Sequence, residues 1–454
     1  KNGHAAGTDL GQVSGPPDRR LVSIDYTNAA GAGLLVRHQS NITLSQVNFS
    51  YNSVDSSQAT IRTNPALGNP AGASGGAAIA AIDENTTVTV IGSSFENNTC
   101  GGFGCNGGAL NAMLESSFKV FLSQFKNNSA DRNGGAIRGK DAHDLEVYAS
   151  SFENNIITGG SIGDESGGAI GAINSNIKVE SSYFKQNASS FTAGGGAIFF
   201  HSTFDDSEPY VLNVGNSTFE NNSGGYIGGG AINISANNIN PATKAVISNN
   251  TLSNNVAIGV GGAIYADIVP TVIENSNFNN NQAGTNGGAV FASVFQDSIL
   301  TNGLLDLSQR SVVSISNSTF KQNQIVGIPV GLPPSEFIFN IFASALSSIF
   351  SNGQGSVTLM SPGGGAVASE FSGNVHISSS HFENNSAPNG SGGALLVGGA
   401  TGTPDAMNQA YMKIENSTCS NNTALNGNNS AVLDPANLGN TPNGVQLDSD
   451  GSCL

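Results

Sequence analysis

Two short phrases alternate along most of this chain and limit its fold more than any other feature. The first phrase is Gly-Gly-Ala followed by a small or aliphatic residue. Its first glycine stands at residues 75, 107, 134, 167, 195, 229, 261, 287, 364 and 392. The second phrase, such as SSFENN, centres on one apolar slot. That slot is filled by Phe49, Phe95, Phe125, Phe152, Phe184, Phe219, Leu252, Phe278, Phe320, Phe382 and Cys419.

The stretches between these phrases alternate apolar and polar residues, as in TTVTVIGSSF and SNIKVESSYF, and a period of two predicts strands. One unit therefore consists of a Gly-Gly-Ala strand, a loop, an alternating strand, a short Phe strand and an asparagine corner. Such a unit cannot bury its apolar side alone, so it must stack on copies of itself. We expect an all-β parallel β-helix of about eleven turns with three short strands per turn, in which the Phe slots form one internal column.

Asparagine and glycine suit the corners of such a coil for different reasons. Asparagine tolerates the left-handed backbone region and can hydrogen-bond along a stack of like side chains. Paired glycines allow unusual torsions and add no lateral bulk where the chain enters a strand.

The charge balance excludes some classes of partner. The chain has 16 Lys plus Arg against 32 Asp plus Glu, which gives a formal net charge of -16. Nucleic acid and anionic membranes need clustered cations, so neither is an expected partner. No apolar run approaches the roughly 20 residues that cross a bilayer, and Lys1 follows no leader, so we expect a processed chain or an omitted signal.

The four cysteines fall into two local pairs, Cys100 with Cys105 and Cys419 with Cys453. None lies in a CxxC motif or near clustered histidines, so disulfides are a better interpretation than zinc ligands. Disulfides place the protein outside the cytosol. A bridge from Cys419, in the Phe column, to Cys453 would hold the C-terminal tail on the last turn.

The repeat defines three segments and one interruption. We expect residues 34–425 to form a single β-helix, with 1–33 as an N-terminal arm or cap and 426–454 as a C-terminal cap. The 25-residue apolar insertion at 329–353 breaks the period, and PPSE followed by apolar spacing predicts a helix near 333–351, although FIFNIF also fits a strand. Its apolar face would cover the side of the coil or contact a neighbouring subunit. That face consists of Phe337, Ile338, Ile341, Phe342, Ala345, Leu346, Ile349 and Phe350.

The alternation of GGA[ILV] with FxxN over roughly residues 75–425 resembles the repeats of the polymorphic membrane protein family of chlamydiae, with related repeats in surface proteins of algae and other protists. The resemblance implies a right-handed parallel β-helix at a cell surface with adhesive or structural work. Autotransporter members end in a membrane barrel, whereas this chain ends NGVQLDSDGSCL. The resemblance therefore leaves a cleaved passenger, a fragment or an independent secreted relative.

The sequence contains two short matches to catalytic motifs, and neither has the surrounding pattern that its chemistry needs. The GxGxxG match at 102–107 lacks a surrounding strand and helix, and the GxSxG match at 72–76 lacks an α/β-hydrolase pattern. Polysaccharide lyases and hydrolases share the β-helix and need carboxylates on adjacent turns. The nearest acids are Asp164, Glu165, Asp205, Asp206 and Glu208, which the pattern places in loops. The histidines, His4, His38, His143, His201, His376 and His381, match no common site, so we expect no catalytic, cofactor or metal residues and no enzyme.

Sequons for N-glycosylation are abundant. They begin at Asn41, Asn48, Asn85, Asn97, Asn127, Asn187, Asn216, Asn221, Asn233, Asn249, Asn317, Asn384, Asn389, Asn416, Asn421 and Asn428. Five of them, Asn97, Asn127, Asn221, Asn384 and Asn421, stand two residues after the column slot and would form an outward row. The alternative is that these five are buried members of an asparagine ladder.

These features together predict an extracellular or cell-surface scaffold: a rigid, acidic, glycosylated rod with a structural or adhesive role. Because parallel coils have unpaired strand edges at both ends, head-to-tail self-association into a filament is also expected. The rival hypotheses are a polysaccharide lyase or hydrolase and an autotransporter-type adhesin passenger.

Overall fold

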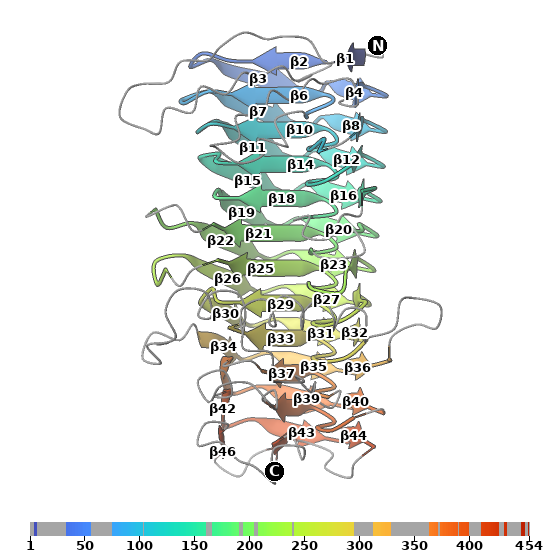
Figure 1. The fold of residues 1–454 in the computed structure, drawn as a ribbon, viewed down its shortest axis with the longest axis vertical. Coiled ribbons are helices and arrows are strands. Elements are labelled where there is room, and N and C mark those ends of the chain that lie inside the picture. The colour runs from blue at the N-terminus through green and yellow to red at the C-terminus, as the bar shows by residue number, and fades with distance from the viewer. Residues whose placement is uncertain are drawn as a thin grey trace, which may run out of the picture. The chain divides into compact units, whose positions relative to one another are not determined.

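The computed structural model describes residues 4–6, 33–55, 75–102, 104–159, 166–189, 194–203, 208–237, 240–294, 312–327, 363–370, 373–388, 390–398, 410–425, 431–433, 446–449 and 453. All regular structure in these residues is β-strand (Figure 1). The chain divides into two compact units, which we call the N-terminal unit (Lys1–Lys178 with Ser182–Thr192) and the C-terminal unit (Val179–Ser181 with Ala193–Leu454). The predicted insertion at 329–353 lies outside the described residues.

The turns of the N-terminal unit contribute strands to four parallel sheets, numbered here in chain order along a turn, and all but the last turn contribute to all four. The first sheet contains β2 (Leu34–Val36), β6 (Ile79–Ile82), β10 (Leu110–Met113), β14 (Ile137–Lys140) and β18 (Ile170–Ile173). The second contains β3 (Asn41–Ser45), β7 (Thr87–Ile91), β11 (Ser117–Phe121) and β15 (Asp144–Tyr148), and β19 (Asn176–Glu180) crosses the unit boundary. The third contains β4 (Asn48–Ser50), β8 (Ser94–Glu96), β12 (Gln124–Lys126), β16 (Ser151–Glu153) and β20 (Tyr183–Lys185). The fourth contains β1 (His4–Ala6), β5 (Ser53–Asp55), β9 (Thr99–Gly101), β13 (Ser129–Ala130) and β17 (Ile156–Ile157).

The C-terminal unit repeats this order. Its first sheet contains β21 (Ile198–Ser202), β25 (Ile232–Ala236), β29 (Ile264–Asp267), β33 (Val290–Ser293), β37 (Val367–Ser369), β41 (Leu395–Val397) and β45 (Ala431–Leu433). Its second contains β22 (Val211–Gly215), β26 (Lys244–Ser248), β30 (Thr271–Glu274), β34 (Val312–Ser316), β38 (Asn374–Ser378), β42 (Tyr411–Glu415) and β46 (Gln446–Ser449). Its third contains β23 (Thr218–Glu220), β27 (Thr251–Ser253), β31 (Asn277–Asn279), β35 (Thr319–Lys321), β39 (His381–Glu383) and β43 (Thr418–Ser420). Its fourth contains β24 (Ser223–Gly224), β28 (Val256–Ala257), β32 (Gln282–Ala283), β36 (Gln324–Ile325), β40 (Ser386–Ala387) and β44 (Thr423–Ala424).

The predicted fold class is confirmed: the units are all-β, right-handed parallel β-helices with about eleven turns between them. The structure adds one element that the sequence pattern did not show. After most of the corners that end the third sheet, a strand of two or three residues pairs with its equivalent one turn along, as β28 pairs with β32. A fourth, narrow sheet therefore accompanies the three predicted ones.

The third sheet places the Phe slots directly above one another. Phe125 pairs in register with Phe95 and with Phe152, and both ring pairs have centroids 4.7 Å apart. In the C-terminal unit, Phe278 and Phe320 stack at 4.6 Å. These side chains have no exposed surface, so the burial of each one stabilises the fold by roughly 2 to 3 kcal/mol. Leu252 occupies the same column and is fully buried, whereas Phe49 and Cys419 are half-buried.

An asparagine ladder runs beside the aromatic column. In a typical rung, Asn255 Nδ2 donates to Phe219 O at 3.0 Å and to Asn281 Oδ1 at 3.0 Å. Asn255 Oδ1 in turn accepts from the backbone N–H and the Nδ2 group of Asn222, both at 3.0 Å. Each rung thus satisfies its amide group through the turns on both sides, as buried polar groups require.

The first glycine of each Gly-Gly-Ala phrase is required by backbone geometry. Gly261, for example, has φ +65°, and a Cβ there would lie 2.4 Å from Ile264 O. No other residue fits this entry to the first sheet without moving backbone, because the atom in the way is a carbonyl oxygen.

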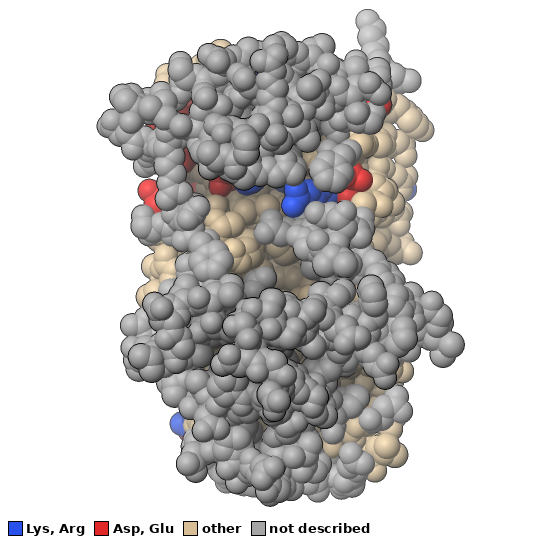
Figure 2. Space-filling model, viewed as in Figure 1, with Lys and Arg blue, Asp and Glu red and all other residues tan. Residues whose placement is uncertain are grey.

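The first sheet is buried on both faces. Ile264 and Ala266 of β29 point into the coil, while Tyr265 and Asp267 alternate with them and are also buried. Tyr265 packs outside the coil in an apolar cluster with Phe291, Ala368 and Leu396. In the view of Figure 2, which faces this sheet, charged atoms are few among the described residues.

Candidate functional surfaces

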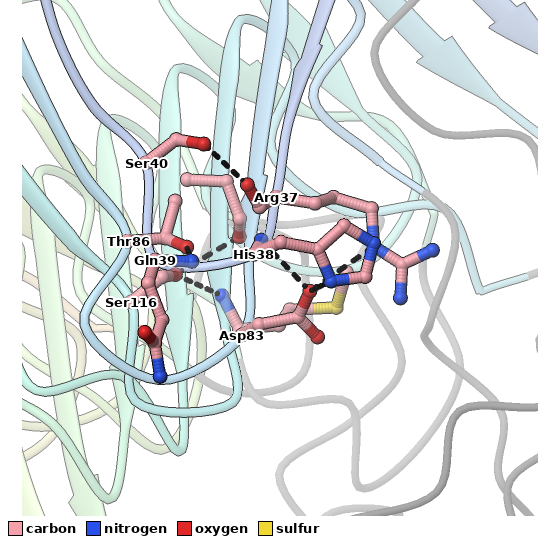
Figure 3. A network of polar contacts seen from close by, with 9 residues as sticks. Arg37, His38, Gln39, Ser40, Asp83, Thr86 and Ser116 are labelled. Carbon is pink, nitrogen blue, oxygen red and sulfur yellow. Dashed lines mark hydrogen bonds and ion pairs between the residues drawn. The ribbon is translucent and has the colours of Figure 1, made fainter.

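A polar network joins the turns between the first and second sheets of the N-terminal unit (Figure 3). Asp83 Oδ2 accepts hydrogen bonds from Arg37 Nε and from the backbone N–H of His38, both at 3.2 Å. Gln39 N–H donates to Thr86 Oγ1 at 3.2 Å. His38, Gln39 and Asp83 have φ values of 61°, 59° and 86°, which are unfavourable for side chains larger than glycine. The network therefore stabilises strained turns, and we assign it a structural role.

Sequence reasoning missed a polar stripe on the outer face of the first sheet in the C-terminal unit. One member comes from each successive turn: His201, Ser235, Asp267, Ser293 and Glu370. All five residues are buried. The signal that could have found them is simple, since each lies six residues after the first glycine of its Gly-Gly-Ala phrase.

Hydrogen bonds within the stripe show what it can do chemically. His201 Nδ1 lies 2.9 Å from Ser235 Oγ, and Ser293 Oγ donates to Asp267 Oδ1 at 2.8 Å. Burial, and then the charge of Asp267, hold the pKa of the neighbouring Tyr265 hydroxyl well above its usual range. A nucleophilic triad needs a histidine between a serine and an acid. This order is absent from the contacts of these described residues.

The last carboxylate of the stripe, that of Glu370, accepts a hydrogen bond from an asparagine side chain that in turn binds a backbone N–H group. Glu370 Oε1 accepts from Asn286 Nδ2 at 2.7 Å, and Asn286 Oδ1 accepts from the N–H of Gly363 at 3.0 Å. The acid therefore orients an asparagine at the entry to the first sheet.

The acids proposed as catalytic candidates from sequence do not form a described site. Asp164, Glu165, Asp205 and Asp206 lie outside the described residues, and Glu208 is exposed. Within the described part of the chain, no group of three or more His, Cys, Asp and Glu residues could hold a metal ion. A search of the same residues finds no helix that could span a membrane.

Both predicted disulfides are present. Cys100 bonds to Cys105, and both are buried in a cluster with Val54, Ala130 and Ile157. Cys419 bonds to Cys453 across 34 residues, with the Cα atoms 4.8 Å apart. The bond therefore holds Cys453 beside Cys419, a residue of the Phe column.

An aromatic and ionic surface lies on the second sheet of the N-terminal unit. Lys119 Nζ lies 2.9 Å from Glu146 Oε1, and Tyr148 OH donates to Glu146 Oε2 at 3.0 Å. Burial raises the pKa of the Glu146 carboxyl, but the hydrogen bonds from Lys119 and Tyr148 outweigh it, so that the pKa lies below its usual 4.5. The rings of Phe121 and Tyr148 stack at 5.1 Å, and Leu122 beside them is 65% exposed.

The sequons separate by exposure. Those at Asn187 and Asn233 are buried, at 0% and 2% exposure, and Asn187 is a ladder member that donates to Phe152 O. The exposed or half-buried sequon asparagines are Asn41, Asn48, Asn85, Asn97, Asn127, Asn216, Asn221, Asn249, Asn317, Asn384, Asn416 and Asn421. Asn389 and Asn428 lie outside the described residues.

The five sequons two residues after the column slot are not the ladder members. Asn97 has φ 56° and its side chain reaches the surface, while the next residue, Asn98, is fully buried and bonds to Asn128. The first asparagine of each pair therefore makes the corner, and the second makes the rung.

The predicted subunit-contact residues all lie outside the described residues. They are Phe337, Ile338, Ile341, Phe342, Leu346, Ile349 and Phe350. Of the predicted N-terminal arm, β1 is described, and it pairs in parallel with β5. Of the predicted C-terminal cap, β45 pairs with β41 and β46 pairs with β42.

Comparison with known proteins agrees with the repeat resemblance. Residues 123–140 and 246–267 match the Chlamydia polymorphic membrane protein repeat. Each matched segment holds one column slot and one Gly-Gly-Ala phrase. Among curated proteins, none matches the chain.

One solved structure matches the chain weakly. It is the catalytic domain of a GH87 α-1,3-glucanase in complex with nigerose, with 9% sequence identity and a TM-score of 0.23. The similarity covers 92% of this chain and 64% of that domain. A score this low carries no argument about function.

Proposed function

We propose that this chain is an extracellular structural or adhesive scaffold glycoprotein, a rigid β-helical rod of a cell surface, appendage or matrix. The observation that carries the proposal is the ladder. Aromatic and asparagine side chains often bind ligands in other proteins. Here the aromatic rings stack on their equivalents one turn along, and the asparagines hydrogen-bond to theirs, as Asn255 does with Asn222 and Asn281. The match to a polymorphic membrane protein repeat and the two disulfides support an extracellular location.

Self-association is the second part of the proposal. Parallel sheets leave strand edges that must be covered or paired. In this chain, β1 pairs in parallel with the edge of β5. His4 lies opposite Ser53, 49 residues further along the chain. A second copy that adds strands in the same direction would form an open, head-to-tail filament.

Electron microscopy of the native protein tests the filament. We expect filaments whose length increases with protein concentration. Rods that stay single at high concentration would remove the self-association proposal, and binding of such single rods to cells would favour the adhesin passenger.

We also propose that the chain is not an enzyme. The stripe acids Asp267 and Glu370 are each 1% exposed, which a substrate-contacting carboxylate would not be. Incubation of the purified protein with acidic polysaccharides should leave their chain length unchanged. Depolymerisation that is lost in an Asp267→Asn or a Glu370→Gln variant would establish the polysaccharide-active alternative instead.

A further inference from the structure

Two corners of the coil generate sequons as a direct result of their geometry. One corner joins the second sheet to the third, and the other joins the third sheet to the fourth. In both, the first residue has positive φ, the second points inward to a ladder, and the third begins a strand. Asparagine favours the first position, and Ser or Thr at the third position completes the N-x-S/T pattern.

The corner between the second and third sheets carries one row of sequons in the C-terminal unit. Asn216, Asn249, Asn317 and Asn416 have φ values between 47° and 57°, and all four are exposed. Each is followed by a buried residue, such as Ser318 after Asn317, and then by a threonine at the start of a third-sheet strand.

The corner between the third and fourth sheets carries a second row. In the C-terminal unit it contains Asn221, Asn384 and Asn421, with φ values of 56°, 57° and 53°. Asn221 and Asn421 are exposed and Asn384 is half-buried. Two corners of one turn, such as Asn216 and Asn221, lie at either end of a three-residue strand, about 17 Å apart along the chain at roughly 3.3 Å per residue.

We propose that these two rows carry the N-glycans of the C-terminal unit, so that sugars cover the outer face of its third sheet. The inference rests on the glycoprotein part of the proposed function and selects which sequons are used. Folded protein can carry a glycan only where the asparagine side chain reaches the surface. The corner asparagines meet that condition: they are exposed or half-buried, and the amide nitrogens of Asn216, Asn221 and Asn384 donate to half-buried glutamates rather than into the coil. The ladder sequon Asn187 does not, because its Nδ2 donates to Phe152 O inside the coil.

The sugar coat has a boundary in the N-terminal unit. Its corners between the second and third sheets hold Gln46, Gly92, Leu122 and Ala149, all with positive φ and none in a sequon. There Leu122 is 65% exposed in place of an asparagine. Of the two corners, only the other one carries sequons in this unit, at Asn97 and Asn127. The exposed sequons at Asn41, Asn48 and Asn85 lie outside both corners.

Glycopeptide mass spectrometry of the native protein is the first test. We expect glycans at the corner asparagines and an unmodified Asn187 and Asn233. A native protein with bare corners, or one with a glycan at Asn187, would overturn the proposal.

Engineered sequons give a sharper test in protein secreted from a eukaryotic cell line. Asn254 is a corner residue of the second row whose sequon fails only because Val256 stands at the third position. Val256 is 37% exposed, so Val256→Thr changes shape and burial little, and should add one glycan at Asn254. The absence of a new glycan in folded V256T protein would contradict the proposal.

Two matched variants complete the design. Thr319→Val should remove one glycan, the one at Asn317, whereas Ser189→Ala, which deletes the sequon of buried Asn187, should leave the glycan mass unchanged. A glycan lost in S189A would refute the burial argument. Filament images of the same variants separate the two proposals, because a wrong glycan map leaves assembly unaffected and failed assembly leaves the glycan map unaffected.

Discussion

Replacement of one rung of the asparagine ladder should destabilise the coil far more than replacement of its neighbour in sequence. Asn255→Ala removes two donated hydrogen bonds, to Phe219 O and Asn281 Oδ1, and two accepted from Asn222. At about 1 kcal/mol net for each bond, the expected loss is about 4 kcal/mol. The buried N–H of Asn222 is also left without an acceptor, so this figure is a lower bound.

Native-state hydrogen exchange is the appropriate assay, because stacked repeats need not unfold in one step. The Asn222 amide is the reporter, since it donates directly to Asn255 Oδ1. A loss of about 4 kcal/mol corresponds to a decrease in its protection of roughly a thousandfold. The matched control is Asn254→Gly, which removes one exposed bond from Asn280 and keeps φ 55° accessible, so protection should change by less than tenfold.

The reasoning fails on one clear result. If N255A lowers protection of Asn222 by less than tenfold, or by no more than N254G does, then the rungs do not hold the turns together. The stability of the coil would then come from the aromatic column alone.

Three further predictions concern backbone, charge and cross-link. Gly261→Ala should destabilise the protein strongly, because its Cβ would meet a carbonyl oxygen at 2.4 Å, whereas Gly101→Ala should change the urea midpoint little, since nothing lies within 4 Å of that position. The pKa of Glu146 is below 4.5 in the folded protein. Its ionised carboxylate therefore stabilises the fold at pH values above 4.5, and this stabilisation is lost as the pH falls through the folded-state pKa. Glu146→Gln should therefore lower the urea midpoint at pH 7, and its difference from the parent protein should shrink as the pH falls below 4.5. The Cys419–Cys453 bond closes a loop of 34 residues, so its reduction should lower the free energy of unfolding by about 4 kcal/mol. Limited proteolysis of the reduced protein should then cleave the C-terminal tail first. A tail that stays resistant after reduction would show that its strands alone hold it.

The repeat phrases predicted the coil and its inner column because each depends on residues within one unit, and the sequence-local pairing of the cysteines predicted the disulfides. Phe95 and Gly107 show this, since an inward aromatic and a positive-φ glycine are recognisable locally. The fourth sheet escaped prediction because two-residue strands such as Val256–Ala257 are too short for a period-two pattern to register.

The outer face of the first sheet could not be predicted from local pattern. Tyr265 and Asp267 stand at positions that a single-sided sheet would expose, yet both are buried. Burial on that side depends on contacts between turns, such as the stacking of Tyr265 on Phe291, 26 residues further along the chain. Alignment of the Gly-Gly-Ala phrases would have shown the polar stripe as a column, but not that it is covered.

Rung geometry does not depend on the length of chain between rungs. Asn255 and Asn281 are 26 residues apart and Asn323 and Asn385 are 62 apart, yet both pairs bond at 3.0 Å. Segments of very different size therefore leave and rejoin the same framework without disturbing it. The sequence between two successive rungs can therefore diversify, or receive a grafted peptide for display, while the framework stays constant.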